Sequence, residues 1–233
     1  MSLKLREEVA EGGASCILEP APVIGSAPAA TSRVVDEAIR MLEGGRVYQS
    51  LKLAVLLSSI PGFERYEEAL RRRVEAVMEG MGYIDAHGLF PWLLYVVAGS
   101  RYKNFLFWGP PNSGKSFTVQ LIKEILEVPD DQFFIVHPDL TRPDFKSNVL
   151  EAGIRSGNTE PQLSELGKAL EIASSLSPED PPAIIVFEEV DQFPHGVLKQ
   201  GNTFFEPVRR VHVTMYGRTF KWEVPADRLL VFG

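Results

Sequence analysis

Residues 109–116 limit the folds open to this chain more than any other segment does, because their sequence GPPNSGKS can wrap its backbone around a phosphate group. An apolar run at residues 105–108 precedes them, and a helical pattern at residues 117–126 follows. Gly109 and Gly114 let N–H groups turn toward phosphate oxygens at backbone angles that a Cβ would obstruct. The order of strand, glycine-rich loop and helix therefore predicts a nucleotide-binding site.

The last two residues of this loop have separate tasks in the prediction. The ammonium group of Lys115 bridges the β- and γ-phosphate oxygens, and the hydroxyl group of Ser116 ligates Mg²⁺. The N-terminus of the following helix adds a partial positive charge. Because it contacts the phosphate that is transferred, Lys115 is also a predicted catalytic residue. The predicted nucleotide-binding residues are Gly109, Pro110, Pro111, Asn112, Ser113, Gly114, Lys115, Ser116 and Phe117.

The second half of the predicted site is the acidic pair Glu188 and Glu189, which follows a continuous apolar run at residues 183–187. Such a run indicates a strand of a parallel sheet, and ligands bind at the carboxyl ends of these strands. We expect Glu188 to hold Mg²⁺ through its water shell, and the catalytic Glu189 to orient the water that attacks the γ-phosphorus. Two alternatives stay open: the pair begins a surface loop, or Asp191 is the acid on the metal side.

Composition places the chain among globular proteins, since 45% of its 233 residues are hydrophobic and 24% are charged. This length suffices for one α/β domain with a smaller attachment. No apolar run could cross a bilayer or serve as a signal peptide, so we expect a cytoplasmic protein without membrane contact. The single Cys16 excludes an internal disulfide, and the histidines lack metal-ligand spacing. The net charge of -7 argues against a general nucleic-acid coat.

The pattern along the chain predicts three parts. Residues 1–32 are rich in alanine, proline and glycine, and we interpret them as a flexible tail. Residues 33–82 carry three amphipathic helical patterns separated by glycine and proline, which predicts a small helical bundle beside the main domain. Residues 83–233 form the α/β domain. Its parallel strands are expected near Phe105, Phe133, Ile185 and Val231.

Between the second and third of these strands the sequence is less informative. Residues 137–145 predict a loop and the start of a helix. A polar stretch that is compatible with a helix follows at residues 146–160. Leucine spacing then predicts a helix over residues 161–175.

Apolar and polar residues alternate on both sides of Tyr216 and Gly217, which predicts a two-stranded hairpin with a tight turn. Residues 209–221 contain four basic residues and no acid, so the hairpin is predicted to be locally positive. These cations either contact an anionic polymer, or they keep an exposed hairpin soluble and pair with acids of a neighbouring subunit. The candidate substrate contacts are Arg210, Arg218 and Lys221.

The order of these motifs resembles that of an AAA+ ATPase. The segment HPDLTRPDF at residues 137–145 is similar to the one after the second strand in MoxR-type and McrB-type members. Residues 206–233 resemble the stretch between the Walker B helix and sensor 1 in those families, including its pre-sensor β-hairpin. The resemblance covers residues 83–233. It implies the P-loop NTPase (AAA+) fold, a parallel sheet flanked by helices, here with an N-terminal helical attachment.

The resemblance also implies an activity and an assembly. Residues 109–116 correspond to the Walker A motif, and Glu188 with Glu189 to Walker B, so ATP and Mg²⁺ are the implied cofactors. ATP hydrolysis would remodel a macromolecular partner, either protein or DNA. The implied assembly is a homo-oligomeric ring, by family resemblance a hexamer.

The chain departs from the family pattern in two places. Walker B usually has Asp before the catalytic Glu, and the longer Glu188 shifts the Mg²⁺ water shell. The strand near Val231 should lead to a polar sensor 1 residue, but the sequence ends at Gly233. We therefore expect an ATPase core that is incomplete at its C-terminal end, as a fragment of a longer polypeptide or as a subunit that takes these groups from a neighbour.

Several alternatives stay open at this point. GPPNSGKS and the strand-end acids also resemble superfamily 3 viral helicases, which favours a DNA helicase or translocase. Glu188 and the missing sensor favour a non-hydrolysing nucleotide-dependent switch. By family analogy the loop of Gly82, Tyr83 and Ile84 touches the adenine base, whereas both side chains suit a hydrophobic core equally well. The motifs do not separate ATP from GTP.

Overall fold

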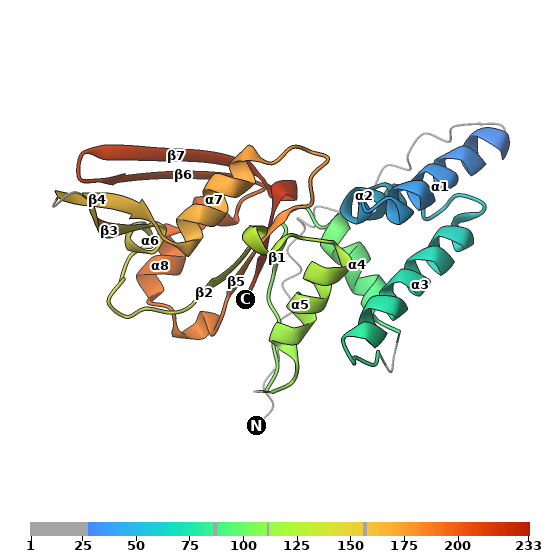
Figure 1. Cartoon of the computed structure of the whole chain (residues 1–233), viewed down its shortest axis with the longest axis horizontal. Helices are drawn as coiled ribbons and strands as arrows, with labels where there is room; N and C mark the ends of the chain where they lie inside the picture. Colours follow the sequence, from blue (N-terminus) through green and yellow to red (C-terminus); the bar gives the residue numbers. More distant parts are fainter. Residues whose placement is uncertain (1–27, 86–87, 111, 156–157) are drawn as a thin grey trace, which may run out of the picture.

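A four-stranded parallel sheet lies at the centre of the computed structural model, which describes residues 28–85, 88–110, 112–155 and 158–233 (Figure 1). In spatial order its strands are β1 (Asn104–Phe105), β8 (Leu229–Phe232), β5 (Ala183–Phe187) and β2 (Phe133–Val136). The sequence AIIVF of β5 is buried along its whole length, as expected for a strand covered on both faces. The four predicted parallel strands and the α/β class are thus confirmed.

Helices cover both faces of the sheet, and alternate residues of each strand feed two separate cores. Ile184 and Val186 of β5 belong to one core, and Ile185 and Phe187 belong to the other. Figure 1 shows α1–α5 on one side of the sheet and α6–α8 on the other. The helices are α1 (Pro28–Glu43), α2 (Val47–Leu57), α3 (Phe63–Gly80), α4 (Phe90–Gly99), α5 (Lys115–Ile125), α6 (Phe145–Val149), α7 (Glu165–Ser175) and α8 (His195–Gln200). Short 3₁₀ helices are η1 (Asp130–Gln132), η2 (Val190–Gln192), η3 (Asn202–Phe205) and η4 (Ala226–Arg228).

The three helices predicted for residues 33–82 are present as α1, α2 and α3. Their apolar faces share one core with α5 and with the sheet, so they pack as part of the α/β domain. Of the predicted tail, residues 1–27 lie outside the described residues, and residues 28–32 belong to α1. Helix α4 was not predicted, because its sequence FPWLLYVVAG is almost entirely apolar and has no amphipathic period. Within the described ranges no helix is long and apolar enough to cross a membrane.

Two antiparallel hairpins accompany the sheet, β3 (Leu150–Arg155) with β4 (Asn158–Leu163) and β6 (Val208–Met215) with β7 (Arg218–Pro225). The predicted β6–β7 hairpin is confirmed, and Tyr216 and Gly217 turn it at φ values of 48° and 74°. The prediction of a helix from residue 161 is wrong at its start. Residues 161–163 lie in β4, and α7 begins after Ser164, whose hydroxyl group accepts from the N–H of Gly167. Pairing with β3 overrides the helical leucine spacing here.

Candidate functional site

The glycine-rich segment joins the end of β1 to the start of α5. Beyond the assigned strand, the N–H of Phe107 donates to the carbonyl of Gly233 (2.8 Å), so the backbone still pairs with the end of β8. The chain then turns through two left-handed residues, Asn112 (φ 63°) and Gly114 (φ 83°). Gly114 is the N-cap of α5, so the helix begins directly after a left-handed residue. Pro111 lies outside the described residues.

Lys115 reaches back over this loop. Its Nζ donates to the carbonyl oxygens of Gly109 (2.8 Å) and Pro110 (2.9 Å). Ser116 and Phe117 follow it on the first turn of α5, and both are exposed, as are Asn112 and Ser113. The predicted residues of this segment that the structure describes are therefore exposed or half-buried at the carboxyl end of β1, and none of them is buried.

The acidic pair lies at the same edge of the sheet, because it follows the parallel strand β5. The N–H of Glu188 donates to the carbonyl of Val136 (3.1 Å), which extends the pairing of β5 with β2. Glu188 is half-buried, whereas Glu189 is exposed and adopts a left-handed backbone conformation (φ 49°, ψ 51°). Asp191 is exposed within η2.

A histidine that the sequence analysis missed contacts Glu188. Nδ1 of His137 lies 3.2 Å from Oε2 of Glu188. The two residues are neighbours because Val136 and Phe187, the last residues of β2 and β5, are partners in the parallel register. The sequence holds the signal for this contact only in part: both residues directly follow a strand, but which strands are adjacent is decided by the fold.

Gly233 lies between the two halves of the edge. A Cβ added to Gly233 would lie 3.5 Å from Cβ of Val190, beyond the acids, and 3.6 Å from Cδ1 of Leu106, ahead of the loop. In the sheet, strand β8 lies between β1, which leads to Lys115, and β5, which leads to the acids. Such an edge can hold a phosphate group on one side and place carboxylates opposite it.

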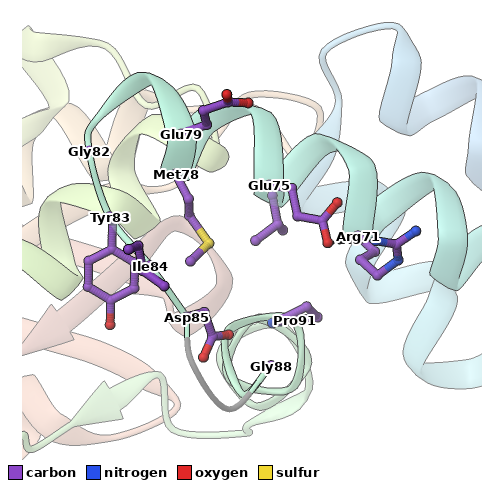
Figure 2. A pocket seen from close by; sticks show the side chains of 11 residues that line it. Arg71, Glu75, Met78, Glu79, Gly82, Tyr83, Ile84, Asp85, Gly88 and Pro91 are labelled. Atoms are coloured by element: carbon purple, nitrogen blue, oxygen red, sulfur yellow. Dashed lines mark hydrogen bonds and ion pairs between the residues drawn. The ribbon is translucent and has the colours of Figure 1, made fainter.

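The segment of Tyr83 and Ile84 lies beside the start of α5. The rings of Tyr83 and Phe117 stack with centroids 5.7 Å apart, and Phe90 meets Tyr83 edge-on at 6.3 Å. Ile84 is 85% exposed and does not belong to the core. Tyr83 is half-buried and packs against the core. Figure 2 shows both at one end of a cavity of about 550 Å³ beside α3, with Pro91 among the residues opposite.

The basic residues of the β6–β7 hairpin differ in their neighbours and in the face of the hairpin on which they lie. Arg210 lies 3.6 Å from Glu223 across the hairpin, and Arg218 lies 3.6 Å from Glu160 of β4. The β6–β7 register puts Arg210 and Lys221 on one face of the hairpin and Arg218 on the other. All three are exposed.

The fourth hairpin cation, Arg209, is fully buried. Its Nη2 donates to Oδ1 of Asn104 (2.9 Å) and to the carbonyl of Tyr102 (3.2 Å). The local positive charge predicted for the hairpin is therefore partly offset in space: acids from β7 and β4 lie beside two of its cations, and a third is inside the protein.

Comparison with known proteins assigns no family to this arrangement: neither the protein-family models nor the curated proteins give a match. Among the described residues, no group of three or more His, Cys, Asp or Glu side chains could hold a metal ion.

Proposed function

We propose that this protein binds Mg²⁺-ATP at the carboxyl edge of its sheet and hydrolyses it, as an AAA+ ATPase of the MoxR/McrB-like type. The observation that carries the proposal is the loop between β1 and α5, where Asn112 and Gly114 are left-handed and Lys115 is bent over the loop. The acids Glu188 and Glu189 at the end of β5 support hydrolysis in addition to binding.

The residues of the loop fit a triphosphate. The N-terminus of α5 carries unpaired N–H groups and a partial positive charge, and both favour an anion. Lys115 exchanges its two carbonyl acceptors for oxygens of the β- and γ-phosphates. The exposed hydroxyl group of Ser116 supplies a protein ligand for the metal. When bound, Mg²⁺-ATP supplies a γ-phosphoryl group that can be transferred to water.

The acids take different roles because their environments differ. Glu188 is half-buried and contacts Nδ1 of His137, a contact that would orient its carboxylate for holding the water shell of the metal. Glu189 is exposed and accepts a hydrogen bond from the attacking water, which it thereby orients. Left-handed backbone at Glu189 turns this residue away from the strand direction, and strain of this kind is frequent at active sites.

The remaining features of the proposal rest on the family resemblance. They are a homo-oligomeric ring, a hexamer in those families, and coupling of hydrolysis to remodelling of a protein or DNA partner. A DNA helicase or translocase is the second candidate function. It is favoured by the exposed Arg210 and Lys221, which share one face of the β6–β7 hairpin.

Calorimetric titration with Mg²⁺-ATP tests binding. Lys115→Ala should weaken ATP affinity roughly 5- to 150-fold, the equivalent of about 1 to 3 kcal/mol for a charge-assisted contact. Lys168→Gln is the matched control, because Lys168 is exposed on α7 and pairs there with the exposed Glu165. Trp108, 92% exposed and adjacent to the loop, offers a fluorescence signal for the same titration. Equal affinity in Lys115→Ala and the parent protein, with the fold intact, would remove the nucleotide site from this loop.

Steady-state hydrolysis separates the enzyme from a nucleotide switch. In any assembly that hydrolyses ATP, Glu189→Gln should keep Mg²⁺-ATP binding and lose turnover, since the amide is a poor acceptor for the water proton. Glu188→Gln should raise the Mg²⁺ concentration needed for binding. Glu165→Gln on α7 is the control for loss of a surface carboxylate. Parental turnover in both strand-end variants would mean that the pair is a surface loop, and tight binding without any turnover in the parent would favour the switch.

A further inference from the structure

A second cavity, of about 620 Å³, opens at the other end of the sheet. It lies between α2, the end of α4 and the segments that enter β1 and β8. We call it the basic cavity, and its charged lining residues are Lys52, Arg101, Lys103 and Asp227. Leu53 and Leu56 of α2 contribute to an apolar wall, and the Leu56 side chain is largely exposed at 79%. The volume is in the range of small-ligand sites.

Positive charge exceeds negative charge in the lining of this cavity. The carboxylate of Asp227 serves two ammonium groups, Nζ of Lys52 at 2.6 Å and Nζ of Lys103 at 3.5 Å. Arg101 is exposed, and its guanidinium group lies 6.0 Å from the ring centroid of Tyr102. The lining therefore carries three cations and one acid, in a protein whose net charge is -7.

Arg209 is a buried cation that contacts Tyr102 and Asn104, the residues on either side of Lys103. Its hydrogen-bond acceptors, on Tyr102 and Asn104, are both neutral, and its Nε and Nη1 have no partner in the described part of the chain. Burial lowers the pKa of Arg209 to about 10, so it stays charged at neutral pH. Burial also lowers the pKa of Lys103, against the attraction of Asp227, and repulsion from Lys52 and Arg209 lowers it further. Lys52 and Arg209 are thus close enough to Lys103 for their charges to repel it.

We propose that the basic cavity binds a small amphiphilic anion, with a carboxylate head between Lys52 and Arg101 and an apolar body along Leu53 and Leu56. An anion at this place offsets the repulsion among the cations, which the single carboxylate of Asp227 balances only in part. The apolar wall would contact the apolar body of the anion, and burial of that surface would add to the charge contacts of the head group. The inference is independent of nucleotide binding, because the cavity lies at the opposite ends of β1 and β8 from the glycine-rich loop.

Octanoate is a suitable probe, with octanol and octylamine as neutral and cationic controls of equal chain length. Titration calorimetry on the intact protein should detect octanoate binding that neither control reproduces. Lys52→Gln should weaken octanoate binding roughly tenfold or more, as expected for a lost charge-assisted contact. Leu56→Asp should weaken it by a comparable factor, because it places a like charge at the mouth. Since Leu56 is exposed, this variant keeps the fold.

Three further variants differ in their expected effect. Asp227→Asn should tighten octanoate binding, because it removes the acid that occupies Lys52. Lys168→Gln on α7 and Lys115→Ala at the proposed nucleotide site should leave octanoate affinity unchanged, so the two proposals can fail separately. The inference is overturned if octanoate binds no better than octanol, or if Lys52→Gln and Leu56→Asp bind it as the parent does.

Discussion

Replacing Asp227 by asparagine is a sharp test of how the helical region is joined to the sheet. Asp227 lies in η4 directly before β8, and its carboxylate contacts Lys52 of α2 and Lys103 ahead of β1. The two contacts connect segments from three parts of the sequence. Asparagine keeps the shape of the side chain and removes its charge, so the change in stability reports mainly on the two ion pairs.

The magnitude follows from the exposure of the partners. The contact with Lys52 is half-exposed, at 39% and 47% of the two side chains, and contributes up to about 1 kcal/mol. Lys103 is buried, and removing the partner of a fully buried ion costs roughly 3 to 5 kcal/mol. Lys103 keeps two carbonyl acceptors, Val97 and Ala98, and Asp227 is itself half-exposed, so we expect about 1 to 2 kcal/mol for this contact. The sum reaches about 2 to 3 kcal/mol if the contact with Lys52 contributes its full value of about 1 kcal/mol.

Urea unfolding at neutral pH measures this difference, and thermal unfolding should show a drop in Tm of roughly 4 to 12 °C. Asp36→Asn is the matched control: its pair with Arg65 is 2.8 Å long but more than half exposed, so it should cost less than about 1 kcal/mol. Equal losses in the two variants would refute the argument that the buried Lys103 makes Asp227 more costly to replace.

The pH dependence of the Asp227→Asn effect has a definite sign. Burial raises the pKa of Asp227, but the hydrogen bonds and charges of Lys52 and Lys103 outweigh it, so the folded pKa is below the usual value of about 3.9. The stabilising contribution is therefore complete above the unfolded pKa and is lost as the pH falls through the lower folded pKa. The difference between parent and variant should stay constant from neutral pH to about pH 5 and vanish only in strong acid.

Two further predictions concern the proposed function. Gly114→Ala forces a Cβ into left-handed backbone, at about 1 to 2 kcal/mol, and should weaken ATP binding, whereas Gly217→Ala carries the same strain in the β6–β7 turn and should leave ATP affinity unchanged by calorimetry. If DNA binds the hairpin, Arg210→Ala with Lys221→Ala should lower the slope of log K against log salt by up to about 2, and Arg218→Ala on the opposite face should not, as DNA titrations at several salt concentrations can decide.

Strands with strong local patterns could be predicted from the sequence, and the segments that depend on distant partners could not. Strand β5 is a continuous apolar run between turn signals, and β6 and β7 alternate around a turn that favours positive φ. In β3 and β4 apolar and polar residues alternate less regularly, so neither segment indicates a strand without the other to pair with it.

The candidate site follows the same division. The loop between β1 and α5 could be predicted because its constraint is local, namely backbone turns that glycine permits. The contact of His137 with Glu188 could not, because it depends on β2 lying next to β5. Burial of Arg209 was also missed, since an arginine in an alternating strand is expected at the surface, and its acceptors lie on a distant segment.

Both proposed sites contain residues other than glycine with positive φ. Positive φ at a residue other than glycine costs roughly 1 to 2 kcal/mol, and in the described residues five such positions occur. The positive φ of Tyr216 is required by the β6–β7 turn. The positive φ of Glu127 is required by the end of α5, where the N–H of Val128 donates to the carbonyl of Lys123. The other three are Lys103, Asn112 and Glu189.

No turn or helix end of this kind accounts for the positive φ of Lys103, Asn112 and Glu189. Lys103 lines the basic cavity, Asn112 lies in the glycine-rich loop, and Glu189 is the proposed catalytic acid. Strained residues persist where the surrounding structure holds them, and they concentrate at sites that bind or react. If strain at these positions is retained for ligand contacts, Asn112→Gly should raise stability or leave it unchanged while reducing ATP affinity, because glycine relieves the strain and removes the side chain. Paired unfolding and binding measurements on this variant decide the point, and a variant that is less stable yet binds ATP normally would assign the strain at Asn112 to folding alone.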